Sequence, residues 1–310
     1  MKPRILIAYH EDHARIESVT LLPIQTGCAG AAELFDGMLR DDDGENISAE
    51  NDKYCELSAQ YWAWKNYDKL GAPEVIGFMH YRRHFMFDGW QGNPDCVWLP
   101  GSSMYLVPHI TPNYLEHIAE RHIEAALADC DCIVLKPYDV THLGQPDVRT
   151  QYAALPKQDT TIFDCFIATA KRLYPEYAAA IAKLEHGSVQ YLCNMFIMRR
   201  EQFFEYSEFC FNILREVDKQ IDSRHMCLAA KRFLGYLGEF CLTLYIFHRQ
   251  AQGALRIKEL NGSFIIADEP VLHPKRKYWY YKLMSKITWG KRRRRYKEKR
   301  RQMKMLLKQN

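Results

Sequence analysis

Short apolar runs recur along the first 260 residues and are typical of strands buried in a sheet. Longer segments between them carry apolar residues at helical spacing, which predicts amphipathic helices. Strands are expected at residues 4–9, 74–79, 130–137, 191–198 and 255–260. Helices are expected at residues 51–66, 113–129, 161–184, 201–217 and 224–250. Residues 138–160 show neither pattern and are expected to form a long loop.

Strands that alternate with helices predict an α/β fold in which a mainly parallel sheet is flanked by helices. The chain has 310 residues, of which 47% are hydrophobic, so it can bury a substantial core. We expect one domain over residues 1–270, followed by a basic helical tail over residues 271–310.

Charge is divided unevenly between this domain and the tail. Residues 275–310 contain 16 Lys or Arg and a single acid, Glu298, whereas the rest of the chain has a net charge of −11. Aromatic residues lie beside the basic run, a combination that suits the headgroup region of an anionic membrane. We expect residues 275–308 to bind a membrane surface. Two less favoured alternatives are binding of nucleic acid through the same charges and a terminus that is merely solvated and frayed.

The remaining composition bears on location and on cysteine chemistry. The longest apolar run, residues 240–247, is far shorter than the roughly 18 residues that a membrane span needs. The N-terminal apolar stretch is too short for a signal peptide, so we expect a cytoplasmic protein, peripheral on the inner face of the cell membrane. The 10 cysteines include no Cys-x-x-Cys pair and no zinc-type spacing, which predicts buried thiols without disulfides or zinc.

The most informative motif is Gly77-Phe-Met-His-Tyr-Arg-Arg-His-Phe85, in which an apolar strand ends in His80, Tyr81, Arg82 and Arg83. Arginine presents a planar fork of donors that matches phosphate oxygens, so two adjacent arginines with flanking imidazoles predict an anion site. A solvated strand end with both arginines paired to acids is the alternative.

Several blocks of the chain, taken in order, resemble a bacterial family that was long labelled only as a domain of unknown function. The family occurs in capsule, exopolysaccharide and lipopolysaccharide clusters, looks like a glycosyltransferase family, and includes relatives that transfer galactofuranose. The matching blocks lie within residues 4–260 and comprise residues 42–48, 54–57, 61–66, 77–85, 194–198 and 235–239.

The resemblance implies a GT-A-like fold and a glycosyltransferase that moves a hexose from a UDP-sugar to a lipid-linked glycan. UDP-galactofuranose is the expected donor, and inversion is the expected stereochemical outcome. His80, Arg82 and Arg83 would then bind the donor diphosphate. Two alternatives stay open: a non-catalytic protein that binds anions or nucleic acid, and a phosphotransferase acting on the same glycans.

Two carboxylates, Glu239 and Glu56, are candidates for the catalytic base that a glycosyltransferase needs. An unpaired carboxylate is costly to bury, which favours a functional role. Glu239 follows two glycines in an aromatic helix, and we expect it to be a general base or to accept a sugar hydroxyl. Glu56 is the rival base. The alternative for Glu239 is a salt bridge to Lys231 or Arg232.

Sugar or nucleotide contacts are expected from residues near the ends of the predicted strands and from an acidic turn. Asn194 loosely resembles the Asn of a sugar-binding sequence in some GT-A enzymes, although a capping Asn in a core strand is the alternative. The acidic run 41–43 could instead hold a cation or be a solvated turn. The full set of expected contacts is Tyr9, His10, Asp43, Asn46, Tyr81 and Asn194.

Many GT-A enzymes hold a divalent metal with an Asp-x-Asp motif where this chain has His80-Tyr-Arg-Arg83. We therefore expect no cofactor and no metal, with the arginines in the role of the metal ion. Asp129 and Asp131 do have Asp-x-Asp spacing, but they precede a strand, so a turn between helix and strand is favoured over a metal site.

Overall fold

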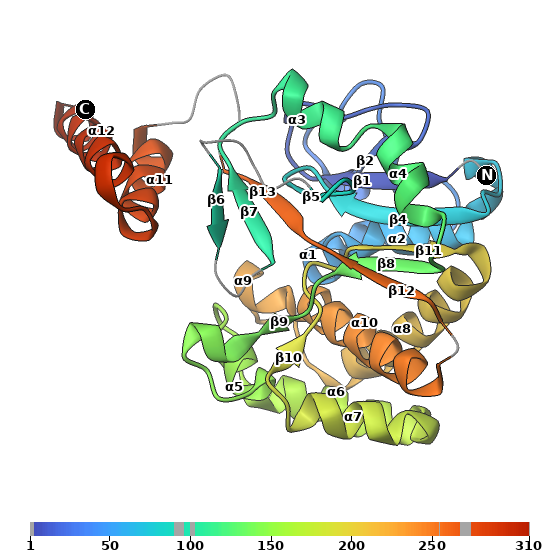
Figure 1. Ribbon diagram of the computed structural model, residues 1–310. Helices are drawn as coiled ribbons and strands as arrows, with labels where there is room; N and C mark the ends of the chain where they lie inside the picture. The colour runs from blue at the N-terminus through green and yellow to red at the C-terminus, as the bar shows by residue number, and fades with distance from the viewer. Residues whose placement is uncertain (1–2, 90–95, 100–102, 254, 267–273, 310) are drawn as a thin grey trace.

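The computed structural model describes residues 3–89, 96–99, 103–253, 255–266 and 274–309 (Figure 1). Its main sheet is 11-stranded. The strands are β1 (Arg4–Tyr9), β2 (Leu21–Gln25), β3 (Leu39–Arg40), β4 (Val75–His80), β5 (Arg83–Phe85), β6 (Val97–Leu99), β7 (Met104–Val107), β8 (Cys132–Leu135), β11 (Phe196–Arg199), β12 (Ile257–Leu260) and β13 (Gly262–Ile265). A separate pair joins β9 (Tyr138–Asp139) to β10 (Val189–Gln190).

The centre of the sheet is mainly parallel, as the sequence predicts. β1 pairs in parallel with β2 and β4, and β8 pairs in parallel with β12. β11 runs antiparallel between β4 and β8, with Phe196 opposite both Phe78 and Val134. The start of β11 therefore lies at the edge where β1, β4 and β8 end. Ligands of open α/β sheets gather at that edge.

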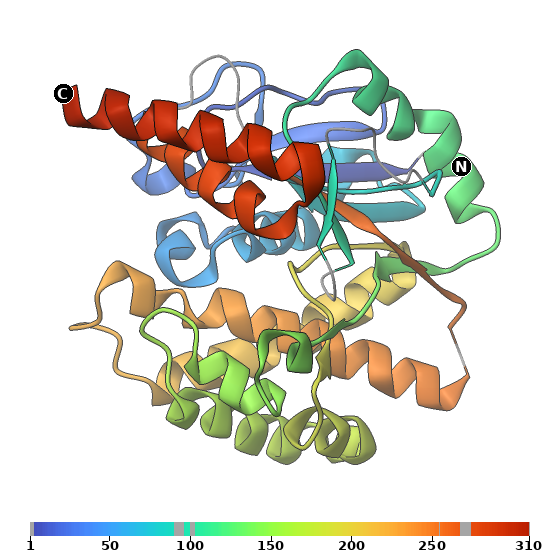
Figure 2. The ribbon, with the colours of Figure 1, turned by 60° about the vertical axis from the view of Figure 1, so that its left-hand side comes forward.

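Helices cover both faces of this sheet (Figures 1 and 2). One face is covered by α3 (Pro112–His117) and α4 (Glu120–Leu127). The thicker layer on the other face contains α1 (Asn51–Tyr54), α2 (Leu57–Lys65), α5 (Val148–Ala153), α6 (Thr160–Leu173), α7 (Ala178–Glu185), α8 (Arg200–Gln220), α9 (Leu228–Lys231) and α10 (Phe233–Gln252).

Alternate side chains of the central strands enter two different cores. Ile76 and Phe78 of β4 pack in the larger core with residues of α2, α8 and α10, whereas Val75 and Met79 pack in the smaller core with α3 and α4. This is the two-residue period of a strand that is buried on both faces. It explains why the strand reads as a continuous apolar run rather than as an alternating one.

The predicted strands are all present, but the helix predictions need correction. Each of the five predicted strand ranges contains a strand of the main sheet, although the fourth begins only at Phe196. The predicted helix 51–66 is broken at Cys55, whose φ of 52° is not helical. The range 161–184, where more than one helix is expected, is divided near Pro175 into α6 and α7. The range 113–129 also contains two helices, and the predicted loop 138–160 contains β9 and α5.

The tail folds into a helical hairpin of α11 (Pro274–Ile287) and α12 (Gly290–Gln309) (Figure 2). Met284 and Tyr296 are buried together with Leu106 of β7, so the hairpin packs against the far end of the sheet. Its outer side exposes Trp279 at 61% and Trp289 at 83%. Within the described ranges, no helix is both long enough and apolar enough to cross a membrane.

The ten cysteines are free thiols. Most of them are buried or half-buried, as predicted, whereas Cys227 is exposed.

Candidate active site

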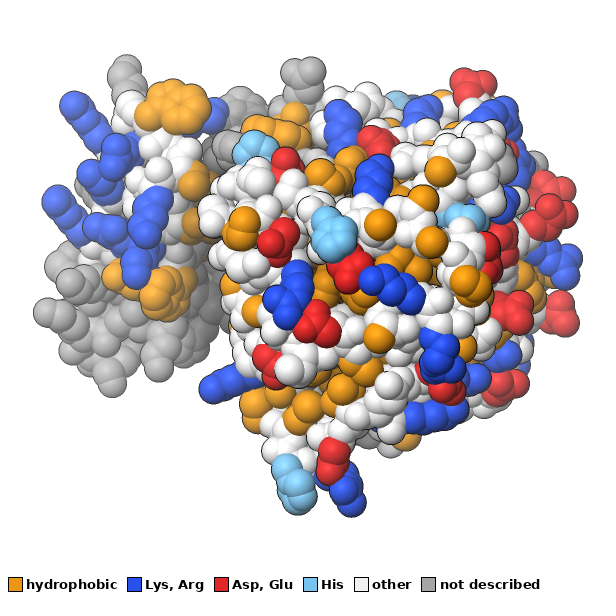
Figure 3. Space-filling model, turned by 90° about the horizontal axis from the view of Figure 1, so that it is seen from below, with side chains coloured by type: hydrophobic (Ala, Val, Ile, Leu, Met, Phe, Trp, Pro, Cys, Tyr) orange, Lys and Arg blue, Asp and Glu red, His pale blue; other side chains and the backbone are white. Residues whose placement is uncertain are grey.

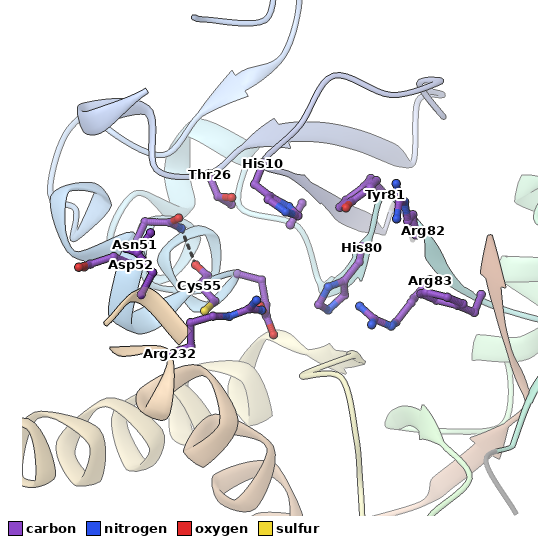
Figure 4. A pocket seen from close by; sticks show the side chains of 14 residues that line it. His10, Thr26, Asn51, Asp52, Cys55, His80, Tyr81, Arg82, Arg83 and Arg232 are labelled. Carbon is purple, nitrogen blue, oxygen red and sulfur yellow. Dashed lines mark hydrogen bonds between the residues drawn. The ribbon is translucent and has the colours of Figure 1, made fainter. Parts of the chain in front are cut away.

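A cavity of about 540 Å³ lies at the carboxyl ends of β1 and β4 (Figure 4). Segments that are distant in sequence form its walls: the ends of β1 and β2, the turn between α1 and α2, the turn from β4 into β5, the stretch from α9 to the start of α10, and Phe264 of β13. The lining side chains from these segments include His10, Thr26, Asn51, Asp52, Cys55, Glu56, His80, Tyr81, Arg82, Arg83 and Arg232.

A second cavity of about 290 Å³ adjoins the first. The two share Cys55, Glu56, Arg83 and Arg232 among their lining residues, so these four side chains surround the junction. Beyond the junction the smaller cavity is lined by Cys193, Gly235, Tyr236 and Glu239. The site therefore has two connected compartments, with cationic groups where they meet.

The hairpin from β4 into β5 explains how the His-Tyr-Arg-Arg motif is displayed. His80 and Arg83 are partners in the antiparallel pairing of β4 with β5, so their side chains lie on the same face. Both point into the cavity, whereas Arg82 lies beside Tyr81 (Figure 4), with its Cζ atom 5.1 Å from the ring centroid. Arg83 thus reaches the junction, and Arg82 lines only the larger cavity.

His80 is held in one orientation. Its Nε2 atom lies 2.5 Å from the carbonyl oxygen of Cys193. A carbonyl can only accept, so Nε2 carries the hydrogen, and burial lowers the pKa of His80. We therefore assign a neutral imidazole whose Nε2–H fixes the segment that leads into β11.

That segment has an unusual backbone that brings the two candidate carboxylates together. Cys193 and Asn194 have φ angles of 72° and 48°. The backbone N–H of Cys193 donates to Oε1 of Glu239 at 2.7 Å, and Nδ2 of Asn194 donates to Oε1 of Glu56 at 2.8 Å. Cys55 beside the same cavities also has a positive φ, of 52°. Positive φ angles are rare for residues other than glycine, and such strained conformations cluster at functional sites.

Two glycines allow α10 to approach the turn between α1 and α2. A Cβ atom on Gly235 would lie 2.9 Å from Sγ of Cys55. On Gly238 it would lie 2.6 Å from a methyl carbon of Leu57 and 2.9 Å from Oδ1 of Asn194. Any larger residue at these positions would push the helix away, and Glu239 would move with it.

The environment of Glu239 favours its protonated form. Burial raises the pKa of Glu239 to about 8, the Cys193 N–H opposes the rise, and the charge of Glu56 adds to it. Lys231 forms its ion pair with Asp52 at 3.2 Å, and the described ion pairs include none with Glu239. The salt bridge considered as an alternative for this carboxylate is therefore not formed among these residues.

The structure places some of the expected contact residues elsewhere. Of the six, His10 and Tyr81 line the larger cavity, and Asn194 lies beside it, bonded to Glu56. Tyr9 is fully buried in the smaller core, where its hydroxyl accepts from the backbone N–H of Ile16.

Asp43 and Asn46 lie in the loop before α1, and neither lines either of the two cavities. Asp43 pairs with Lys69 at 2.7 Å, and Asn46 donates to the carbonyl oxygen of Gly44 at 2.8 Å. Their polar groups hold the loop in place.

Asp131 is engaged in a structural role at the opposite edge of the sheet. It lies in the turn between α4 and β8, together with Asp129, as expected from the sequence. Its carboxylate binds Arg199 and Arg256, each at 2.8 Å, and these partners lower the pKa of Asp131. In the part of the chain that the structure describes, no group of three or more His, Cys, Asp or Glu could hold a metal ion.

The sequence analysis missed Arg232 as a cavity residue. It lies between α9 and α10, and a single arginine before an aromatic helix has no local pattern that distinguishes it from a surface residue. Only the packing of α10 against the turn at Cys55 brings it to the junction.

Comparisons with known proteins agree with this architecture. A family model described as a domain of unknown function, DUF4422, matches residues 4–250. The apo structure of WbbM, a bifunctional glycosyltransferase, is similar, with a TM-score of 0.79 and 30% sequence identity. The match covers 88% of this chain and 48% of WbbM, so the chain spans about half the length of WbbM. No curated protein matches the chain.

Proposed function

The chain belongs to the DUF4422 family, and from this premise we propose that it is a glycosyltransferase that transfers a hexose from a UDP-sugar. One observation carries the proposal: two connected compartments meet at cationic side chains, and a carboxylate lies in the smaller one. A nucleoside diphosphate and a sugar need compartments of this kind. The similarity to WbbM supports the same class of activity.

In the proposed reaction the donor diphosphate is bound by Arg82 and Arg83. His80 assists by fixing the wall of the site, since its Nε2–H is donated to the carbonyl oxygen of Cys193. The acceptor hydroxyl oxygen bonds to the anomeric carbon, while the bond from that carbon to the diphosphate oxygen breaks and its electron pair leaves with UDP. A carboxylate takes the hydroxyl proton: Glu239 in its ionised form, whose share grows as the pH approaches its pKa of about 8, or the rival base Glu56. The guanidiniums stabilise the charge that develops on the departing diphosphate.

We propose that this charge stabilisation does not require a divalent metal. GT-A enzymes that use one hold it with carboxylates, but the β4 strand here ends in His80, Tyr81, Arg82 and Arg83. Cationic side chains at this place fit a diphosphate and do not fit a metal ion. No step of the proposed reaction passes through a metal.

The identities proposed for the donor and the acceptor rest on the family resemblance of the motif blocks, not on the shape of the cavities. The resemblance implies UDP-galactofuranose as the donor and a growing lipid-linked glycan as the acceptor, in the synthesis of capsule, exopolysaccharide or lipopolysaccharide. Transfer would occur in one displacement, with inversion at the anomeric carbon.

The tail hairpin fits a lipid-linked acceptor. Trp279, Leu283 and Trp289 are exposed next to Lys and Arg side chains that are gathered on the tail (Figure 3). Exposed aromatic residues beside cations suit the surface of an anionic leaflet. We propose that the tail holds the enzyme on the cytoplasmic face of the membrane, where the acceptor lies.

The decisive experiment incubates the purified protein with a panel of UDP-sugars and a lipid-linked acceptor, with and without EDTA, and measures released UDP and the product. We expect release with one sugar, most of all UDP-galactofuranose, and the same rate in EDTA. Release that EDTA abolishes would overturn metal independence. A phosphodiester product would identify a phosphotransferase, and the absence of any UDP release would favour a binding protein.

A further inference from the structure

Arg232 lies on the helical wall of the site, opposite the sheet-side Arg83. Figure 4 shows the two side chains reaching into the cavity from opposite sides, Arg83 from β5 and Arg232 from the start of α10. Both line the larger and the smaller cavity. Two guanidiniums therefore face the junction from different layers of the molecule.

These two arginines differ from others on the surface in how their charge is used. Arg149 binds Asp164 at 2.7 Å, and Arg224 binds Asp222 at 2.7 Å. Among the residues that the structure describes, no ion pair involves Arg83 or Arg232. Arg232 has a hydrogen bond to the Cys55 thiol, which is only a weak acceptor, so both guanidiniums keep donors for an anion that enters the junction.

The neighbours of Arg232 keep it directed at the junction. Its Cζ atom lies 5.9 Å from the ring centroid of Tyr236, one turn further along α10, and its charge acts on Cys55 and Glu56. On the other side, the Cζ atom of Arg83 lies 4.9 Å from the ring centroid of Phe264. An aromatic ring supports each guanidinium without occupying its donors.

We propose that Arg232 and Arg83 form a two-sided clamp on the diphosphate of the donor, with the nucleoside in the larger cavity and the transferred sugar in the smaller one. The proposal rests on the proposed function and adds to it a residue and a direction for the donor. The larger cavity, near 540 Å³, has room for the nucleoside, and the smaller one, near 290 Å³, suits a single sugar ring. Tyr236 and Glu239 would then contact the sugar.

The clamp can be tested by binding, separately from turnover. Calorimetry on the whole 310-residue chain would compare the binding of UDP, UMP and uridine by wild type, R232A, R232K and the control R149A. Each lost charge-assisted contact weakens binding by about 1.5–3 kcal/mol, which is roughly tenfold to 100-fold. We expect R232A to weaken the binding of UDP by that factor and the binding of uridine by less than about twofold. R232K should fall between, and R149A should match wild type.

The orientation has its own test. Replacing Tyr236 by Phe keeps the ring that supports Arg232 and removes the hydroxyl that faces the sugar. This change should raise the KM for the UDP-sugar about threefold to tenfold and leave the affinity for UDP unchanged, since UDP has no sugar in the smaller cavity. Equal losses for UDP and the UDP-sugar would show that the sugar lies elsewhere.

The outcomes separate the clamp from the proposed function. The clamp is overturned, and the glycosyltransferase proposal stands, if R232A binds UDP as tightly as wild type does. The same holds if R232A loses as much affinity for uridine as for UDP. If wild type binds UDP through Arg232 but transfers no sugar, the clamp stands and the proposed function fails. If wild type binds no UDP, both are overturned.

Discussion

The molecule carries positive charge in two regions that are built differently. In the cavity, Arg83 and Arg232 face one junction from opposite walls, each beside an aromatic ring. On the tail, residues 292–295 form an uninterrupted run of exposed arginines on α12. On the described part of the tail, the charged side chains that Figure 3 shows are Lys and Arg, whereas both signs of charge are mixed on the adjoining face of the domain.

The difference lies in how each region can recognise an anion. Cavity cations act where water is partly excluded and the effective dielectric is low, so position and geometry decide their effect. Exposed cations act through water, and salt screens them over a Debye length of about 8 Å at physiological ionic strength. The cavity should therefore respond to which arginine is changed, and the tail to how many are changed.

The largest effect should follow from removing Arg83. We expect R83A to lower kcat/KM for the UDP-sugar by about 100-fold to 1000-fold, comparable to the loss of one preorganised donor in other active sites. R83K should recover only part of this, because an ammonium lacks the planar fork. Steady-state UDP release measures the effect.

A thermal melt shows whether the Arg83 variants keep their fold, and R149A supplies the matched control. If R83A were to turn over like wild type with the fold intact, the cavity cations would have no role in the reaction, and the two regions would no longer differ.

Sequence alone predicts the longest apolar strands of the sheet, whereas a short one such as β7 (Met104–Val107) is not among the predicted strands. Residues 4–9 and 74–79 are buried on both faces of the sheet, so each appears in the sequence as an apolar run that predicts a strand. β5 begins with Arg83 and has only three residues, so no local pattern predicts it. The break at Cys55 is equally hidden, because a cysteine rarely takes a positive φ and only the packing against Gly235 explains this one.

The site shows the same limit. The motif blocks pointed to His80, Glu56, Asn194 and Glu239, and the structure brings these four segments together through direct hydrogen bonds around Cys193 and Asn194. Arg232 could not be predicted, since its place depends on how α10 packs.

A second effect, of intermediate size, concerns the ionisation of Glu239. Its pKa is about 8 in the folded protein against an ordinary value of 4.5, so between these values the folded state holds a proton that the unfolded chain has lost. The free energy of unfolding should therefore fall as pH rises to about 8, by up to about 1.4 kcal/mol per pH unit. Glu239→Gln should remove this slope in denaturant titrations.

The window from pH 7 to pH 8 isolates Glu239 from its neighbour His80. The pKa of His80 is lowered by burial, so its contribution to stability rises with pH and is complete above its ordinary value of 6.5. Equal slopes for wild type and Glu239→Gln in that window would show that the carboxylate is already ionised in the folded protein.

The smallest effect should come from any one arginine of the tail. Each basic residue near an anionic surface contributes about 1 kcal/mol, so R292A or R294A should weaken binding to phosphatidylglycerol vesicles about fivefold at low salt. A double variant should multiply the two factors, and salt should weaken wild type most, because it has the most exposed charge to screen. UDP release without vesicles should stay at the wild-type rate. Should one of these replacements alone abolish vesicle binding while its neighbour has no effect, the tail would be recognising a headgroup at a fixed position. The tail would then resemble the cavity, where the effect depends on which arginine is changed, and the proposed difference between the two regions would be wrong.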